Sequence, residues 1–319
     1  MDERPMNEVN AIQPSSLKHL ESISQRAMLD LVRVTLDVCF QDGSKFPHTA
    51  MFGGPGLGKS CLAQTIASEL AVPYKEVTGL SLRSPSDLNS LLLSATDKSI
   101  VFIDESDTMS VATMTALMVA LTSGRISLSS GGGGVRSLPL ADFTLLLATT
   151  EEYGLLQPLR DRMRLTLRFQ YYCEEDIESV VSVRARSLGW SIEDECVADI
   201  ARRSRGTPRI AFNILQAARY VSRSDASDTI LPVHLAKACE LTGVDPLGLN
   251  VATDLAYLNL LLDGDRQLNV LASCLGLPPR TINIVIEPFL LRSGLIEKGK
   301  QSRRALTSKG REHLRGSET

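Results

Sequence analysis

The chain has 319 residues, a formal net charge of −3 and 43% hydrophobic residues, enough to build the cores of two or three domains. The charge excludes a protein that coats nucleic acid uniformly, but it leaves room for a local basic face. The six cysteines include no C-x-x-C pair and the four histidines show no ligand spacing, which excludes a zinc site and predicts reduced thiols. The N-terminus does not resemble an export signal, and no apolar run is long enough to span a membrane. We therefore expect a cytoplasmic protein.

A glycine-rich segment indicates the first functional site. The apolar residues 49–52 precede the sequence GGPGLGKS, and the apolar positions of residues 61–70 recur at helical spacing. Strand, glycine loop and helix form the context in which G-x-x-x-x-G-K-[ST] binds phosphate. Glycines let consecutive backbone N–H groups face one phosphate, and the helix N-terminus adds a positive dipole end. A glycine-rich turn without a ligand is the alternative interpretation.

The loop supplies most of the residues that we expect to bind a nucleotide. Lys59 provides a point charge for the β- and γ-phosphates, and the hydroxyl of Ser60 is a ligand for Mg²⁺. The full set is Gly53, Gly54, Pro55, Gly56, Leu57, Gly58, Lys59, Ser60 and Cys61.

A second segment completes such a site. Residues 99–103 form a continuous apolar run, typical of a strand buried on both faces of a parallel sheet, and the run ends at Asp104 and Glu105. Two acids after a strand are usually a solvated turn, but about forty residues after a P-loop they are typical of ATPase carboxylates. We expect Asp104 to hold the water shell of Mg²⁺ and Glu105 to polarise the attacking water.

Strand-like and helix-like runs alternate up to about residue 172. The further predicted strands are residues 74–77, 143–148 and 165–169, and the further helices are residues 87–94 and 111–121. The third apolar strand is followed by Thr149 and Thr150. This alternation predicts an α/β fold with an open, mostly parallel sheet and the nucleotide at the carboxyl ends of its strands.

Residues 125–138 interrupt the alternation. Two short segments flank four consecutive glycines, residues 131–134, which is typical of a projecting hairpin. A flexible linker is the alternative interpretation.

From residue 174 to about 243 the pattern is helical throughout. Amphipathic helices are predicted at residues 174–188, 193–204, 208–223 and 232–241. The third of these has Pro208 in its first turn, which places Arg209 near a helix N-terminus. There Arg209 could reach into the nucleotide cleft, whereas on a surface turn it would be only a solvated charge.

The last part of the chain predicts a winged helix-turn-helix. Helices at residues 252–262, 268–276 and 279–293 are followed by two short strand-like segments around residues 299–302. Between Lys298 and Arg315 there are seven basic residues and one acid, an excess that suits contacts with DNA phosphates. The expected DNA-binding residues are Lys298, Lys300, Arg303 and Arg304, although many winged helices bind protein instead.

These motifs together resemble the RuvB family of AAA+ ATPases. The resemblance rests on the two ATPase motifs, the threonine after the third strand and three further stretches in order, namely residues 158–162 (PLRDR), 203–211 (RSRGTPRIA) and 287–294 (EPFLLRSG). It runs from about residue 12 to 315. It implies an AAA+ P-loop core at residues 1–172, an all-α helical lid at 173–245 and a winged-helix DNA-binding domain at 246–319.

The resemblance implies an ATP-hydrolysing DNA motor that uses ATP and Mg²⁺. It implies a homo-oligomeric ring, a hexamer in the family, that translocates double-stranded or branched DNA and drives Holliday-junction branch migration in recombination and repair. By resemblance, Thr149 is sensor 1, Arg162 is the arginine finger, with Arg160 as the second candidate, and Arg209 is sensor 2. The alternative is a non-motor AAA+ DNA-binding switch whose nucleotide state controls assembly or loading. A catalytically dead scaffold is disfavoured because the catalytic set is complete.

The chain also departs from the family at four places. The family's Asp-Glu-Ile-His is residues 104–107 (DESD) here, and the Arg that follows its sensor threonines is Glu151. Its adenine-lining Leu-Arg-Pro and Ile-Gly-Gln are IQP at residues 12–14 and ISQ at residues 23–25. The hairpin that docks on RuvA in the family offers only Ile126, Leu128 and Val135 here. We therefore do not expect a RuvA-like partner to dock in the family's manner, unless that partner has changed in step.

Overall fold

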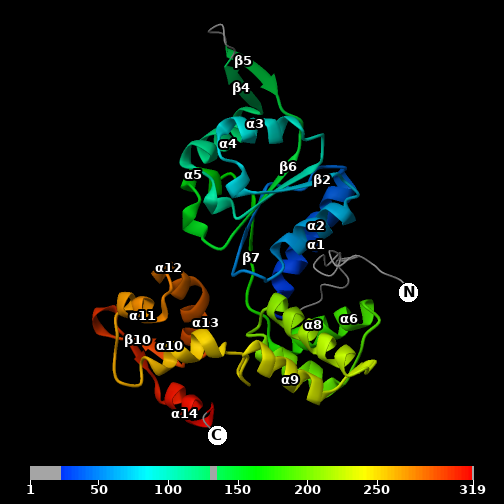
Figure 1. The fold of residues 1–319 in the computed structure, drawn as a ribbon. Helices are drawn as coiled ribbons and strands as arrows, with labels where there is room; N and C mark the ends of the chain where they lie inside the picture. Colours follow the sequence, from blue (N-terminus) through cyan, green and yellow to red (C-terminus); the bar gives the residue numbers. More distant parts are fainter. Residues whose placement is uncertain (1–22, 130–134, 318–319) are drawn as a thin grey trace. The chain divides into compact units, whose positions relative to one another are not determined.

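A computed structural model describes residues 23–129 and 135–317 of the chain (Figure 1). The chain divides into two compact units, Met1–Tyr172 and Cys173–Thr319. In the described part of the chain, no helix combines the length and the apolar character that crossing a membrane requires. The departure at residues 12–14 lies outside the described residues.

The first unit contains a five-stranded parallel sheet, as the alternation of elements predicted. Its order is β2 (Tyr74–Thr78), β3 (Ile100–Asp104), β6 (Thr144–Thr149), β1 (Thr49–Phe52) and β7 (Leu165–Arg168). The register pairs Phe52 with Thr149 and Ile103 with Leu147. Because parallel strands end at the same edge of a sheet, the ends of β1, β6 and β3 meet there. The predicted phosphate loop, sensor threonine and acidic pair follow these three ends.

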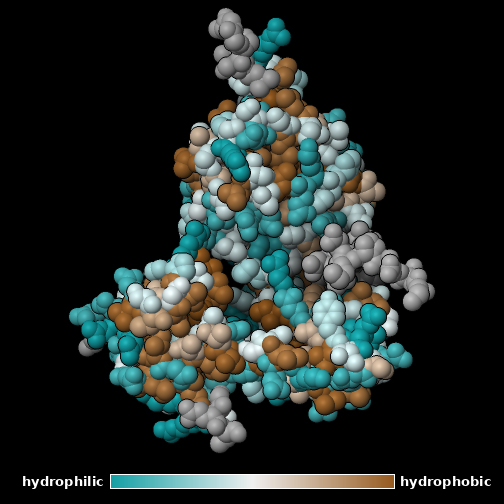
Figure 2. Space-filling model, viewed as in Figure 1, coloured by the Kyte–Doolittle hydropathy of each residue, from teal (hydrophilic) through white to brown (hydrophobic). Residues whose placement is uncertain are grey.

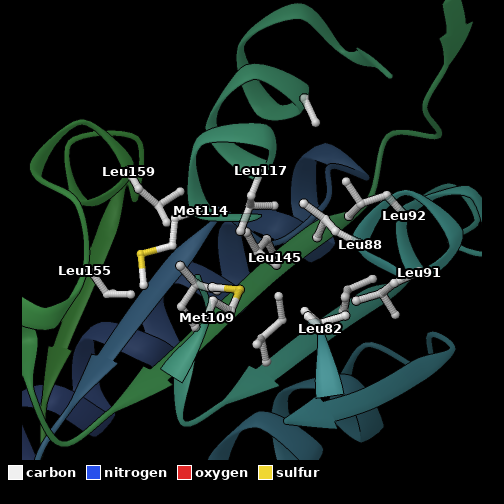
Figure 3. Packing of buried hydrophobic residues seen from close by; sticks show 14 of the residues in the cluster. Leu82, Leu88, Leu91, Leu92, Met109, Met114, Leu117, Leu145, Leu155 and Leu159 are labelled. Carbon is white, nitrogen blue, oxygen red and sulfur yellow. The ribbon is translucent and has the colours of Figure 1, made fainter. Parts of the chain in front are cut away.

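Helices cover both faces of this sheet, which explains why its central strands are apolar throughout. Alternate residues of each strand point to opposite faces, so Phe102 packs against one helical layer and Val101 against the other. The first layer consists of α1 (Arg26–Asp42) and α2 (Lys59–Glu69). The second, whose leucines and methionines appear in Figure 3, consists of α3 (Pro85–Leu93), α4 (Val111–Ser123) and α5 (Gln157–Arg160).

The predicted hairpin is present, formed by the antiparallel strands β4 (Arg125–Ser129) and β5 (Val135–Pro139). The glycines at residues 131–134 lie outside the described residues. One prediction about this hairpin is wrong. Ile126 is not a surface anchor, because it is 3% exposed and belongs to the core of the first unit.

The four helices predicted after residue 173 are confirmed within a few residues at each end. They are α6 (Glu174–Ser187), α7 (Asp194–Arg203), α8 (Pro208–Ser224) and α9 (Pro232–Thr242). Their buried apolar residues recur at helical spacing, as in α7, where Val197, Ile200 and Ala201 face inward. Two short strands, β8 (Ser191–Ile192) and β9 (Thr229–Ile230), pair in parallel beside these helices and were not predicted.

The C-terminal part folds as three helical segments and a small antiparallel hairpin, as predicted. The segments are η6 (Val251–Leu255) with α10 (Ala256–Asn259), then α11 (Leu268–Leu275), then α12 (Pro279–Thr281) with η7 (Ile282–Ile286) and α13 (Glu287–Arg292). The hairpin is β10 (Ile296–Lys298) and β11 (Arg304–Leu306), and an unpredicted helix follows, α14 (Ser308–Ser317).

The third helical segment is not uniform, and Pro288 gives the reason. A proline inside a helix has no N–H to donate, and its ring clashes with the carbonyl four residues earlier. The helix widens to π geometry over η7, immediately before the turn that contains Pro288. The prediction of one helix over residues 279–293 is therefore correct in extent but not in geometry.

Candidate active site

The glycine loop connects β1 to α2 and needs glycine at identifiable positions. Gly56 and Gly58 have φ values of +76° and +98°, which side chains other than glycine rarely adopt. A Cβ on Gly53 would lie 2.7 Å from Cβ of Phe169, so glycine allows the loop to rest directly on that residue. The predicted order of strand, glycine loop and helix is thus confirmed, and phosphate binding by the loop stays a prediction.

Lys59 lies inside the loop rather than in solvent. It is 7% exposed, and its ammonium group donates hydrogen bonds of 2.8 Å to the carbonyl oxygens of Gly53 and Gly54. Both carbonyls belong to the glycine loop, so the ammonium group lies against the backbone that is proposed to hold phosphate. A phosphate bound in the loop would supply negative oxygens to the same ammonium.

Ser60 and Asp104 come together at the mouth of the loop. The Ser60 hydroxyl donates to one carboxylate oxygen of Asp104 at 3.1 Å, and the other accepts the backbone N–H of Glu105 at 2.9 Å. A hydroxyl and a carboxylate are hard oxygen ligands that suit Mg²⁺. Within residues 23–129 and 135–317, no three His, Cys, Asp or Glu side chains gather to hold a metal. Mg²⁺ would therefore depend on this pair, on waters and on nucleotide phosphates.

Glu105 is exposed at a turn with left-handed geometry. Its φ is +47°, and it starts the short helix η4 (Ser106–Thr108), whose residue Thr108 bonds back to the Glu105 carbonyl. Gly79, in η3 (Gly79–Ser81), presses against the same carbonyl: a Cβ there would lie 2.4 Å from the oxygen. Gly79 therefore fixes the place of the turn at Glu105. The sequence reading missed it because nothing local marks this contact.

Thr149 ends β6 between the loop and the acidic pair, but its hydroxyl is already engaged. The side chain is 1% exposed and donates to the carboxylate of Asp107, while it accepts the backbone N–H of Glu151 at 2.9 Å. To act on ATP as sensor 1, Thr149 would have to release Asp107. In the sequence Asp107 stands out only as a departure from the family, and nothing local shows that it accepts a hydrogen bond from Thr149.

Two tyrosines border the loop and were not predicted. The Tyr172 hydroxyl donates to the Leu57 carbonyl at 3.1 Å, and the Tyr171 hydroxyl lies 3.0 Å from the place a Cβ on Gly54 would take. The only signal in the sequence is their position, directly after the last strand of the unit. The two tyrosines limit the space beside Gly54 and Leu57 of the loop.

The thiol of Cys61 is not a reactive group at neutral pH. Burial raises the pKa of the Cys61 thiol to about 11, so the group stays protonated at neutral pH. A thiolate so close to bound phosphates would repel them. The prediction that Cys61 belongs to the loop therefore concerns its N–H, at the start of α2.

The two candidate arginine fingers have different surroundings. The Arg160 guanidinium lies 5.0 Å from the centre of the Tyr153 ring and 3.8 Å from Glu152, and its side chain is 18% exposed. The Arg162 side chain donates to the Thr122 hydroxyl and the Pro158 carbonyl, each at 2.6 Å, and both bonds are exposed. Arg162 is therefore the easier of the two to extend toward a neighbouring molecule.

Arg209 is exposed in the first turn of α8, directly after Pro208. No hydrogen bond or ion pair of its side chain is found among the described residues. Its place at a helix N-terminus agrees with the sequence prediction. Its role toward a nucleotide stays a prediction.

The prediction that Arg304 contacts DNA is wrong. Its side chain is 8% exposed and forms a forked ion pair with Glu287, at 2.6 and 3.2 Å, and a further bond to Asn283. Burial by itself would raise the pKa of Glu287, but the bonds from Arg304, Lys298 and Tyr257 outweigh it and hold this pKa below its usual value. Arg304 thus ties the wing to the third helical segment.

The other basic residues predicted to bind DNA lie on or beside the wing. Arg303 is exposed, and no partner of its side chain is found in the described ranges. Lys298 is 47% exposed and lies 3.2 Å from Glu287, and Lys300 belongs to the turn η8 (Lys300–Ser302). Figure 2 shows apolar patches among polar residues over α11 and the third helical segment, where Val270 of α11 and Val285 of η7 are exposed. Contact between DNA and the exposed basic residues of the wing stays a prediction.

Three family models match consecutive parts of the chain. Residues 12–169 match the P-loop domain of the Holliday junction DNA helicase RuvB, residues 172–245 the RuvB AAA lid domain, and residues 246–315 the RuvB C-terminal winged helix domain.

Individual proteins are similar over almost the whole chain. The RuvB subunit of the Holliday junction branch migration complex from Synechococcus sp. strain CC9311 is 35% identical over 300 residues, 92% of this chain and 83% of its own length. The RuvB subunit of Prochlorococcus marinus strain MIT 9303 is 34% identical over 306 residues, which is 93% of this chain and 86% of its own length. The solved structure of the Thermotoga maritima RuvB Holliday junction branch migration motor has a TM-score of 0.83 and 29% identity, covering 95% of this chain and 98% of that one.

Proposed function

Because the chain belongs to the RuvB family of AAA+ ATPases, we propose that it couples ATP hydrolysis to movement along duplex DNA. The proposed substrate includes the four-way junction, whose branch point the motor would shift during recombination and repair. As a DNA motor the protein would work in the cytoplasm, where its six free cysteines stay reduced.

One observation carries this proposal. Three features lie together at the carboxyl edge of one sheet: the glycine loop with Lys59 inside it, the Ser60–Asp104 pair at 3.1 Å, and Glu105. The same chain continues into a winged helix. The first three are the parts that phosphoryl transfer to water needs. The last is a fold that commonly binds DNA.

The roles of the site residues follow from this arrangement. The backbone of residues 53–61 and Lys59 would hold the phosphates of ATP, and Ser60 and Asp104 would hold Mg²⁺, which neutralises phosphate charge when bound. Glu105 would orient a water molecule and accept its proton. Thr149 would position that water or the terminal phosphate.

Two arginines would complete the site after assembly. Arg162 would reach the ATP of a neighbouring subunit and stabilise charge in the transition state, which makes hydrolysis depend on a ring, proposed to be a hexamer. Arg209 would contact the ATP of its own chain from the lid. We assign the P-loop core to residues 1–172, the lid to 173–245 and the winged helix to 246–319.

The ATPase rate in the presence of different DNA molecules tests this function. We expect strong stimulation by linear duplex and four-way junction DNA, together with ATP-dependent release of the arms of a labelled junction. Indifference to both DNA forms would favour instead a switch whose nucleotide state controls assembly or loading.

Neighbouring arginines of the wing should respond differently to substitution. Arg303→Ala should weaken binding to all duplex sequences similarly and flatten the log–log salt slope by about 0.9, since one phosphate contact is lost. Arg304→Ala should lower the free energy of unfolding by about 3–5 kcal/mol, because it leaves Glu287 buried without its main partner. Fluorescence anisotropy and thermal unfolding separate the two effects. An Arg304→Ala variant of wild-type stability that loses only DNA affinity would contradict this assignment.

The hairpin should not dock on a typical RuvA. Interfaces of this kind depend on a few buried apolar anchors, each worth about 2 kcal/mol or more, and Ile126 is withdrawn into the core. Among the described side chains of the hairpin, Leu138 is the large apolar one that is exposed, at 37%. Loss of two anchors weakens a contact about a thousandfold, at 1.4 kcal/mol per decade.

Calorimetric titration with RuvA from a typical bacterium, and with any RuvA of the same cell, checks this expectation. Weak or absent binding to the first is the expected result. Binding to the typical RuvA with a micromolar or lower Kd, abolished by Leu138→Ser, would show the prediction wrong.

A further inference from the structure

Arg205 belongs to the lid but is anchored in the winged helix. It lies in the turn between α7 and α8, and its side chain is 13% exposed. Its Nε donates to the Gly248 carbonyl at 2.6 Å, and its Nη2 donates to the carboxylate of Asp254. Its guanidinium lies 4.8 Å from the centre of the Phe289 ring. All three partners come from residues 246–319.

The winged helix contacts the same residue in return. Arg292, at the end of α13, donates to the Arg205 backbone carbonyl at 2.8 Å, and its guanidinium lies 5.4 Å from the Phe289 ring. Arg205 is thus held both by its side chain and by its backbone. Asp254 is 3% exposed and also accepts the Asn250 N–H at 2.9 Å, so this anchor is itself fixed.

The backbone of this turn has an uncommon conformation. Arg205 and Gly206 have φ values of +57° and +71°, and Arg205 is a bulky residue in the left-handed region. Such a conformation persists where the surroundings determine it. The backbone at the start of the winged helix also packs closely against the end of α7, since a Cβ on Gly248 would lie 2.1 Å from the Arg203 carbonyl oxygen. The turn and the start of the winged helix therefore move together or lose these contacts.

The turn that contains Arg205 lies directly before the helix that carries Arg209. Arg209, the residue proposed to contact ATP from the lid, is four positions after Arg205, and Pro208 stiffens the start of α8 between them. We propose that Arg205 is a positioning residue that couples the nucleotide state at Arg209 to the orientation of the DNA-binding winged helix. This inference rests on the proposed function and adds the route by which ATP would act on DNA.

Such coupling links the binding of ATP to the binding of DNA. If ATP changes the affinity for DNA by some factor, DNA changes the affinity for ATP by the same factor, and such factors are typically about 5–150. Arg205 should determine this factor without determining either affinity by itself. A residue that merely stabilises the fold would instead lower both affinities and the thermal stability.

The experiment measures the affinity of the full chain for a labelled duplex with and without a non-hydrolysable ATP analogue. In the wild type, we expect the two affinities to differ by at least about fivefold. In Arg205→Lys, which keeps the charge but loses the guanidinium fork, the ratio should fall toward one while the affinity without nucleotide is kept. Asp254→Asn should act in the same way, and the double variant should add little because both substitutions break one contact.

Arg202→Lys is the matched control. Arg202 lies on the same end of α7 but pairs with Asp199 inside the lid, at 2.8 Å, and is 54% exposed. This variant should keep the wild-type ratio. A wild-type ratio in both Arg205→Lys and Asp254→Asn, or a wild type that binds both ligands independently, would overturn the inference. A wild type that binds no duplex would contradict the proposed function itself, and the unsubstituted protein would reveal it.

Discussion

Glu105→Gln should bind ATP with near-normal affinity and hydrolyse it at least about a hundredfold more slowly, because loss of a group that accepts a proton in the transition state usually costs this much. The substitution keeps the size and the hydrogen bonding of the side chain and removes only its capacity as a base. The residue is exposed at the turn that Asp104 and Gly79 hold in place, so the change should not disturb the loop.

Fluorescent-nucleotide binding and steady-state phosphate release measure the two properties separately. Glu76→Gln, the same chemical change on the neighbouring strand β2, is the control and should keep wild-type turnover, since Glu76 is exposed and bonds only Gln64 and Tyr74 among the contacts that the structure gives. Wild-type turnover in Glu105→Gln would remove Glu105 from its proposed role.

Arg162→Ala should retain nucleotide binding and lose hydrolysis, by a factor of about 10³ if it behaves as other arginine fingers do. In the single chain the Arg162 side chain rests on Thr122 and Pro158, so its removal leaves no charge buried without a partner. The loss would therefore report on the neighbouring site rather than on folding.

A mixing experiment tests whether the arginine acts across an interface. Arg162→Ala and Lys59→Ala are each inactive in this scheme, yet together they should recover part of the activity, since a site with an intact loop can meet an intact finger. Arg160→Ala serves as the comparison. Full activity of purified Arg162→Ala, or loss only in Arg160→Ala, would exclude Arg162 as the finger.

Local patterns in the sequence were sufficient to predict the elements of the fold. The apolar runs at residues 49–52 and 99–103 are strands, the glycine loop between strand and helix is present, and the four lid helices end within a few residues of the predicted positions. Periodicity and turn chemistry act over a few residues, so they can be read without knowledge of the fold.

Contacts between distant residues could not be predicted in this way. The order of the strands in the sheet decides these contacts, rather than any local pattern. Thr149 meets Asp107 because β6 lies beside β3, and Gly79 presses on Glu105 because β2 lies on the other side of β3. The same holds for Arg205, whose partners in the winged helix lie more than forty residues away.

Arg303 and Arg304 show the division between sequence and tertiary structure most directly. The sequence by itself determined a basic wing, a P-loop ATPase core and a helical lid, because composition and periodicity specify these locally. Only the tertiary structure decided which arginine turns inward, because that depends on Glu287, seventeen residues earlier, being buried where Arg304 and not Arg303 can reach it.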